Sequence, residues 1–419
     1  MNRDGVLGGE LAAALALCCA LAAGCTEHRG HGLEGAQSIR VTLVAPVDPG
    51  TIDRRLPDTQ RMVVVDLAAL DADGEIDTSF SKQVRVYTQF LGTLTPSLEQ
   101  QPSTIITLTD GVATNQTIAL PARVFGPTTL WIDDGEGTGA EYVPGRIAGA
   151  SPTLWFRDPF IADLQTPRSE TALDALTVTP LQDKQIAVRG SRYGTAGRLV
   201  VTSVFAQGYT VSDVQCADDT GRPPCVAQAY DHAMVFSFSA PRGSDGHVLE
   251  EGEAIDGFGG GLTEFNGLTE VGFPQSFTPP FTDEDGDGVN DAIDRARMPA
   301  PAVLQVDWFG SLSLPTGRIN FERNEAGPIE IRDGIVCPLD EDYTMYRQWK
   351  LDPSGMGGDT CLSDNVINVI TAGVVTSVDP PTLVGRRLPK VVGIFRPVSI
   401  GSFNVWIIYP RAASDVVLQ

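Results

Sequence analysis

The chain has 419 residues, of which 42% are apolar and 20% are charged, values typical of a folded globular protein with room for about two to four domains. Its 53 acidic residues outnumber its 30 basic residues, so the formal net charge is −23. This balance repels nucleic acid and anionic lipid head groups, and it disfavours functions that need a broad basic surface.

Residues 1–24 are expected to be a signal peptide. The apolar stretch from Leu11 to Ala23 is shorter than the roughly 20 residues that a membrane-spanning helix needs. It ends in Leu21-Ala-Ala-Gly-Cys25, which resembles the lipobox of bacterial lipoproteins, although Ala22 stands where leucine is commoner. The resemblance implies that Cys25 becomes the first mature residue and carries acyl chains. The alternative is an ordinary secretory peptide that is cut nearby.

The residues after Cys25 predict where the anchor lies and how the body is attached to it. Thr26, rather than aspartate, follows the cysteine and resembles the signal for the outer membrane rather than for retention in the inner membrane. Residues 25–37 are polar and rich in glycine, so we expect a flexible tether. The predicted location is the cell envelope, at the outer membrane or cell surface, and the predicted membrane contact is the lipid anchor.

The body is predicted to be all-β, because long helical stripes are scarce while β-branched runs alternate with glycine and proline. Residues 38–165 contain short runs at the spacing of a β-sandwich. These runs begin at Ile39, Met62, Gln83, Thr104, Thr117, Thr128 and Pro152. The turn before Asp77-Thr-Ser-Phe80 resembles bacterial immunoglobulin-like surface repeats. We therefore expect an immunoglobulin-like β-sandwich here.

Residues 171–280 carry a further resemblance. The stretch from Gly197 to Asp213, the run from Ala233 to Phe238 and the stretch from Leu262 to Val271 resemble strands of the OB-fold modules attached to secreted bacterial nucleases and phosphatases. The resemblance implies a β-barrel. The catalytic residues of those nucleases lie in domains that this chain lacks.

Residues 300–419 resemble a second barrel of the same kind. The resemblance is carried by Ile329–Val336, Arg347–Leu351, Leu388–Val398 and the stretch that begins at Trp406. The pentapeptide Val-Val-Thr-Ser-Val occurs at Val200–Val204 and again at Val374–Val378, which hints at a repeat, although such a β-branched sequence also recurs by chance.

Between these two segments, residues 281–299 form a linker with a distinctive acidic sequence. When the linker is aligned with a twelve-residue calcium loop, carboxylates fall at loop positions 1, 3, 5, 9 and 12 and glycine falls at position 6. The residue at position 7 would contribute its backbone carbonyl. The predicted ligands are Asp283, Asp285, Asp287, Val289 (through its carbonyl), Asp291 and Asp294.

This loop resembles those of thrombospondin type 3 repeats and dockerin modules, which also end in aspartate. The resemblance implies calcium of modest affinity, because Asp294 is shorter than the bidentate glutamate of an EF-hand. Prolines exclude a helix before the loop. The alternative is a solvated acidic linker without a metal ion.

Four cysteines remain besides Cys25 once the signal peptide is removed, and an even number in an exported chain indicates disulfides. Pairing of nearest neighbours keeps each bridge within one domain. That pairing joins Cys216 with Cys225 and Cys337 with Cys361.

The sequence assigns no catalytic residues. The mature body retains only His232 and His247 as histidines, and no serine has the surroundings of a nucleophile elbow. The C-terminal segment is locally basic near Trp406 and Tyr409, through Arg386, Arg387, Lys390, Arg396 and Arg411, but solvated cations on strand edges are the simpler interpretation.

The function expected from the sequence is that of a non-catalytic envelope lipoprotein that presents β domains to a polysaccharide or a protein partner, with a linker stiffened by calcium. Nucleic acid is not expected as a partner. The alternatives are an accessory nucleic-acid binder that acts beside a secreted nuclease, and a hydrolase whose site is not recognised.

Overall fold

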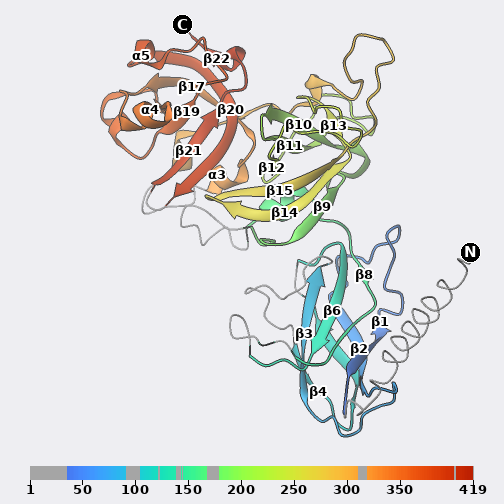
Figure 1. Cartoon of the computed structure of the whole chain (residues 1–419). Coiled ribbons are helices and arrows are strands. Elements are labelled where there is room, and N and C mark those ends of the chain that lie inside the picture. The colour runs from blue at the N-terminus through green and yellow to red at the C-terminus, as the bar shows by residue number, and fades with distance from the viewer. Residues whose placement is uncertain are drawn as a thin grey trace, which may run out of the picture.

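The computed structural model describes residues 35–90, 104–120, 123–137, 143, 145–167, 179–309, 319–400 and 403–418. The predicted signal peptide, Cys25 and most of the predicted tether lie outside these residues. Within them the fold is mostly β with a few short helices, so the predicted predominance of β structure is confirmed (Figure 1).

The N-terminal domain consists of two antiparallel sheets. In the first sheet, β2 (Met62–Leu70) lies between β1 (Ser38–Ala45) and β5 (Val112–Ala119). The second sheet has the order β4-β3-β6-β7, and β8 also pairs with β6. Its strands are β3 (Gln83–Phe90), β4 (Thr104–Thr107), β6 (Pro127–Asp133), β7 (Ala148–Ala150) and β8 (Leu154–Trp155).

One hydrophobic core joins these two sheets. Ile39 and Val41 alternate with exposed residues along β1, and they pack in the same cluster as Val84 and Val86 of the opposite sheet. This period-two pattern buries one face of each sheet and exposes the other face to solvent, so the two sheets pack face to face as two layers.

The middle domain is a single curled sheet of order β13-β10-β11-β12-β15-β14-β9. The strands are β9 (Gln185–Arg189), β10 (Gly197–Phe205), β11 (Gly208–Gln215), β12 (His232–Phe236), β13 (Ala254–Ile255), β14 (Gly257–Phe265) and β15 (Leu268–Phe277). All neighbours are antiparallel except β12 and β15, which are parallel. Strand β13 pairs with the outer edge of β10 and β9 with that of β14. Among the described residues β10 does not pair with β14, so the sheet curls without closing into a barrel.

Strand β10 is buried on both faces, which explains its nearly continuous apolar sequence. Leu199 and Val201 point into the main core of the domain, whereas Val200 packs on the other side against the Cys216–Cys225 disulfide. The main core also contains residues of a short helix, α2 (Ile161–Gln165), which the sequence assigned to the end of the preceding domain.

The C-terminal domain is a closed barrel. The order is β16-β17-β18-β19-β21-β20-β22, and an additional pairing of β17 with β20 closes the ring. Its strands are β16 (Ala302–Val303), β17 (Pro328–Val336), β18 (Gln348–Asp352), β19 (Ile367–Ile370), β20 (Arg387–Ile400), β21 (Phe403–Tyr409) and β22 (Val416–Val417). Short helices α3 (Ile319–Arg323), α4 (Glu341–Tyr346) and α5 (Pro380–Leu383) lie between them. The prediction of a β-barrel is confirmed for this segment.

The middle and C-terminal domains share a strand order. The path β10-β11-β12-β15-β14 in the middle domain corresponds to β17-β18-β19-β21-β20 in the C-terminal domain. In each path the third and fourth strands, β12 with β15 and β19 with β21, pair in parallel. The repeated pentapeptide does not mark this correspondence: Val200–Val204 lies in β10, whereas Val374–Val378 lies in turns after β19. Its recurrence comes from composition rather than from equivalent positions.

These two domains lie side by side, and the N-terminal domain lies next to the middle one (Figure 1). Hydrogen bonds connect the middle and C-terminal domains: Tyr230 N donates to Arg323 O at 2.8 Å. Arg411 Nη1 donates to Thr202 O at 3.1 Å. Met234 and Leu268 of the middle domain also form an apolar cluster with Ala326 of the C-terminal domain. The two domains therefore share a packed interface.

Candidate metal centre

The acidic loop follows β15 and precedes a 3-10 helix, η3 (Arg295–Arg297). Gly286 and Gly288 have φ values of 76° and 81°, a left-handed conformation that side chains rarely adopt. These two glycines let the backbone turn twice within a few residues. The turns fold the neighbouring aspartates back toward one another.

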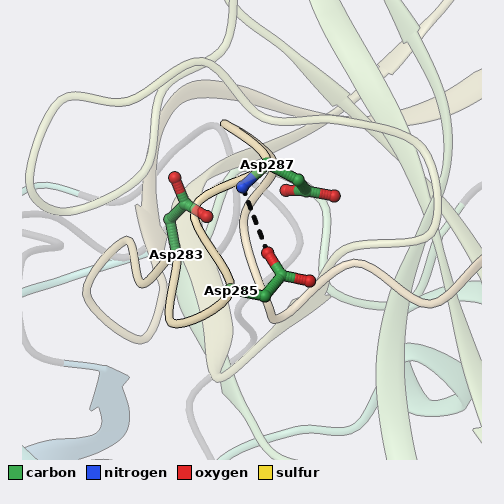
Figure 2. Close-up of side chains that lie close together, drawn as sticks. All are labelled: Asp283, Asp285 and Asp287. Carbon is green, nitrogen blue, oxygen red and sulfur yellow. Dashed lines mark hydrogen bonds between the residues drawn. The ribbon is translucent and has the colours of Figure 1, made fainter.

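Three of the predicted ligands come together. One carboxylate oxygen from each of Asp283, Asp285 and Asp287 lies within 4.8 Å of the others, and this group could hold a metal ion (Figure 2). Backbone amides position the carboxylates: Asp287 N donates to Asp285 Oδ1 at 3.2 Å. Gly288 N donates to Asp283 Oδ2 at 3.0 Å.

The other oxygen of Asp283 has no such partner. Asp283 is half-buried, and its Oδ1 is shielded from solvent and accepts no hydrogen bond. An anionic oxygen removed from water without a donor is unfavourable by about 1–3 kcal/mol or more. A cation bound among the three carboxylates would remove both this cost and their mutual repulsion.

Asp291, Asp294 and Val289 are not part of this group. Asp291 Oδ2 accepts a hydrogen bond from Glu284 N at 3.1 Å. Asp294 caps η3 by accepting from Ala296 N at 3.0 Å, and it lies 3.4 Å from Arg297 Nε. Val289 N donates to Asp287 Oδ1 at 2.8 Å. The spacing of a twelve-residue loop is present, but local capping competes for its last carboxylate.

The loop is attached to the middle domain rather than suspended between domains. Asn290 is buried, and its Nδ2 donates to Glu253 Oε1 at 3.3 Å. Ala254 N donates to Ala292 O at 3.1 Å, and Glu253 forms a β-bridge with Ile293. These contacts hold the second half of the loop against the edge of the curled sheet.

A half-buried histidine joins both ends of the loop. His247 Nε2 lies 2.6 Å from Glu253 Oε1, and its Nδ1 contacts Asp245 Oδ1. Asp245 Oδ2 in turn accepts from Phe281 N at 2.8 Å. Burial lowers the pKa of His247, but the hydrogen bonds and charges of the two carboxylates outweigh burial and raise it.

The pKa of Asp245 is lowered by the hydrogen bond from Phe281 N and by those from His247. The two carboxylates therefore favour the charged form of the His247 imidazole. Sequence reasoning missed this network because Asp245, His247 and Glu253 precede the loop by at least 30 residues and the β14–β15 hairpin lies between them. A Ser-Asp-Gly-His turn was the one local signal.

The predicted disulfides are confirmed, with nearest-neighbour pairing. Cys216 is bonded to Cys225, and Cys337 at the end of β17 is bonded to Cys361 in a 3-10 helix, η6 (Gly358–Leu362). Two disulfides suggest an extracellular or periplasmic protein. None of the helices among the described residues is long and apolar enough to cross a membrane.

Several basic residues of the C-terminal barrel have internal partners. Arg411 pairs with Asp415 through three nitrogen atoms, and Arg387 donates to two backbone carbonyls. Trp406 stacks on Phe395, with ring centroids 4.6 Å apart. These side chains contribute to the packing of the barrel.

His232, the other histidine of the body, is a core residue. Its Nδ1 lies 2.7 Å from Ser212 Oγ, and burial lowers its pKa to about 4. The imidazole is therefore neutral at pH 7. Its ring packs close to Gly327, across the interface between the middle and C-terminal domains.

Comparison with known protein families, with curated proteins and with solved structures finds no match to this chain.

Proposed function

We propose that the protein is a non-catalytic lipoprotein of the cell envelope that presents its β domains to a polysaccharide or a protein partner. The lipobox ending in Cys25 supports the anchor, since two or more acyl chains hold a protein stably on a membrane. The two disulfides agree with an oxidising compartment. The same proposal places the mature chain at the outer membrane or cell surface.

The proposal extends to the individual domains. The two facing sheets of the N-terminal domain support an immunoglobulin-like sandwich. The closed barrel of the C-terminal domain supports an OB-like fold, which is a five-stranded Greek-key barrel. The shared strand order supports an OB-like fold for the middle domain too, although its sheet stays open. Folds of this kind bind many ligands, so the fold does not name one.

The acidic loop is proposed to bind calcium, and the observation that carries this assignment is the buried, unpartnered Oδ1 of Asp283. Carboxylate oxygens are ligands for hard cations, and Ca²⁺ tolerates the irregular coordination that a tightly turning loop provides. Calcium would join the three clustered carboxylates and stiffen the segment that leads from the middle domain to the C-terminal barrel. Asp291 and Asp294, which lie outside the group of three carboxylates, would have to move toward the ion to coordinate it.

Thermal unfolding with and without calcium tests this assignment. We use the chain with Cys25→Ser, which removes the acylation site and keeps the body intact. For a dissociation constant of about 0.1 to 1 mM, 10 mM calcium should stabilise the fold by roughly 1.4 to 2.7 kcal/mol, a rise of several degrees in Tm. Asp285→Ala should abolish the rise.

Glu284→Ala is the matched control, because it removes a charge from the same loop without touching the three clustered carboxylates. It should keep the calcium-induced rise in Tm. Equal Tm values for the unaltered protein in calcium and in chelator would overturn the metal assignment.

Binding to a polymer or a partner is tested separately with the same Cys25→Ser chain on glycan and oligonucleotide arrays and in a pull-down from envelope extracts. Saturable binding to a glycan or an envelope protein is the expected result. Oligonucleotide binding that falls steeply with salt would instead favour the accessory nucleic-acid role.

A further inference from the structure

A cavity of about 600 Å³ lies between the middle domain and the C-terminal barrel. This volume is within the range of small-molecule sites. The middle domain contributes the β10–β11 hairpin, β12 and the turn between β14 and β15, and the barrel contributes β20 and the end of β21. The cavity is separate from the acidic loop.

The lining is mainly apolar. Met234 and Leu268, which pack against the C-terminal domain, line the cavity together with Phe236 and Ile394. A ligand that fills this space must therefore present a hydrophobic body, because burial of apolar surface contributes about 25 cal/mol per Å².

Arg396 supplies a fixed cationic group in the wall. Its guanidinium lies 4.1 Å from the ring centroid of Tyr409, and its Nη2 donates to Tyr409 Oη at 2.7 Å. Its Nε is shielded from solvent and has no hydrogen-bond partner. A buried donor without an acceptor is unfavourable, so an acceptor on a ligand would be recognised here.

Glu270 also lines the cavity. Burial raises the pKa of its carboxyl group, and the positive charge of Arg396 opposes that rise. A carboxyl group in this position can accept a hydrogen bond from an amine or a hydroxyl group of the ligand. The wall therefore suits a molecule with one acceptor and one nearby donor.

Exposed aromatic rings continue outward from the cavity. Phe236, in the lining, makes an edge contact with Phe238 at 5.4 Å, and Phe238 lies 5.0 Å from Phe273. Phe238 is 65% exposed and Phe273 is 81% exposed. Phe273 also has a φ of 50°, an unusual conformation for a bulky residue. Clustered exposed apolar side chains indicate a binding surface.

We propose that this cavity binds a small amphipathic anion, with its apolar body between the two domains and its anionic group at Arg396. The aromatic rings of Phe236, Phe238 and Phe273 guide the apolar part to the opening. This ligand site goes beyond the anchored, calcium-binding role and does not require either property.

Two fluorescent probes with the same aromatic framework test the proposal. Anilinonaphthalene sulfonate is anionic, and N-phenyl-naphthylamine lacks the sulfonate. The Cys25→Ser chain should bind both at a single saturable site. Arg396→Gln should weaken binding of the anionic probe about tenfold and that of the neutral probe less than about twofold.

Ala372→Trp provides a second variant, because Ala372 lies in an exposed part of the lining where a large side chain fills the cavity without disturbing the core. It should weaken both probes about tenfold or more. Arg332→Gln removes an exposed arginine from the same barrel and should change neither affinity. The proposal would be overturned if Ala372→Trp left the affinity for either probe unchanged. It would also be overturned if Arg396→Gln reduced the affinities for the two probes equally.

Discussion

Asp213 has a fully buried carboxyl group in β11. Its Oδ2 accepts from Arg192 N at 2.8 Å, while its Oδ1 has no partner. Burial, reinforced by nearby Asp231, raises the pKa of Asp213 to about 6 against the opposing hydrogen bonds from Ser191 and Arg192. The native state therefore holds a proton that the unfolded chain has lost between about pH 4 and pH 6.

Stability contributed by this proton is complete below the unfolded pKa and is lost as the pH rises through the folded pKa. Between pH 4 and pH 7 the protein should lose roughly 2 to 3 kcal/mol of unfolding free energy relative to an Asp213→Asn variant. Urea unfolding at a series of pH values measures this difference. The exposed Asp219→Asn substitution is the control, and parallel pH profiles for the protein and Asp213→Asn would contradict the assignment.

At the scale of elements, the joint between the two N-terminal sheets depends on one glycine. A Cβ added to Gly149 of β7 would lie 1.8 Å from Ile39 O of β1, which belongs to the other sheet. Strands from the two layers therefore approach backbone to backbone at this edge, where any side chain would separate them.

Gly149→Ala should destabilise the N-terminal domain by about 1–3 kcal/mol, because overpacking at a backbone contact forces the strands apart. Chemical denaturation measures the change. Gly272→Ala in β15 is the matched control, since its new Cβ would meet only Gly261 O at 3.9 Å. Similar losses for the two variants would show that strand propensity, rather than the close approach, determines the effect.

At the scale of the whole molecule, buried acids lie at the interface between the middle and C-terminal domains. Glu325 is 2% exposed, and its Oε1 accepts from Thr269 N of the middle domain at 3.0 Å. Burial raises the pKa of Glu325 well above its ordinary value, and the charges of Glu322 and Glu264 raise it further. The docked state therefore favours the protonated carboxyl group.

The stability that comes from the proton on Glu325 is present below the ordinary pKa of glutamate. It is lost as the pH rises through the raised pKa of Glu325 in the docked state. Alkaline pH should therefore increase hydrogen exchange in residues 262–271 and 319–327, and Glu325→Gln should suppress that increase. The exposed Glu341→Gln substitution is the control. A pH response that persists in Glu325→Gln would remove Glu325 as its cause.

Particular residues show how far sequence reasoning reached. The runs that begin at Ile39, Met62 and Gln83 all became strands, because alternating burial is encoded locally. Among the strands that the sequence did not predict are β9 (Gln185–Arg189) and β19 (Ile367–Ile370). Both are short, and each pairs with a strand far along the chain, β14 for β9 and β21 for β19. In the acidic loop, spacing identified the residues, but capping of η3 by Asp294 depends on the local backbone path.

The sequence by itself determined the properties encoded in neighbouring residues: β structure from alternation, disulfides from an even number of cysteines, and an acidic loop from carboxylates at regular spacing. Only the tertiary structure decided which carboxylates of the loop come together. It also decided that the C-terminal sheet closes into a barrel while the middle sheet, with the same strand order, stays open, and where a cavity forms between these two domains. These outcomes depend on contacts between distant segments, such as β17 with β20 or His247 with the loop ends. Such contacts depend on chain topology and side-chain volume, which no short pattern records.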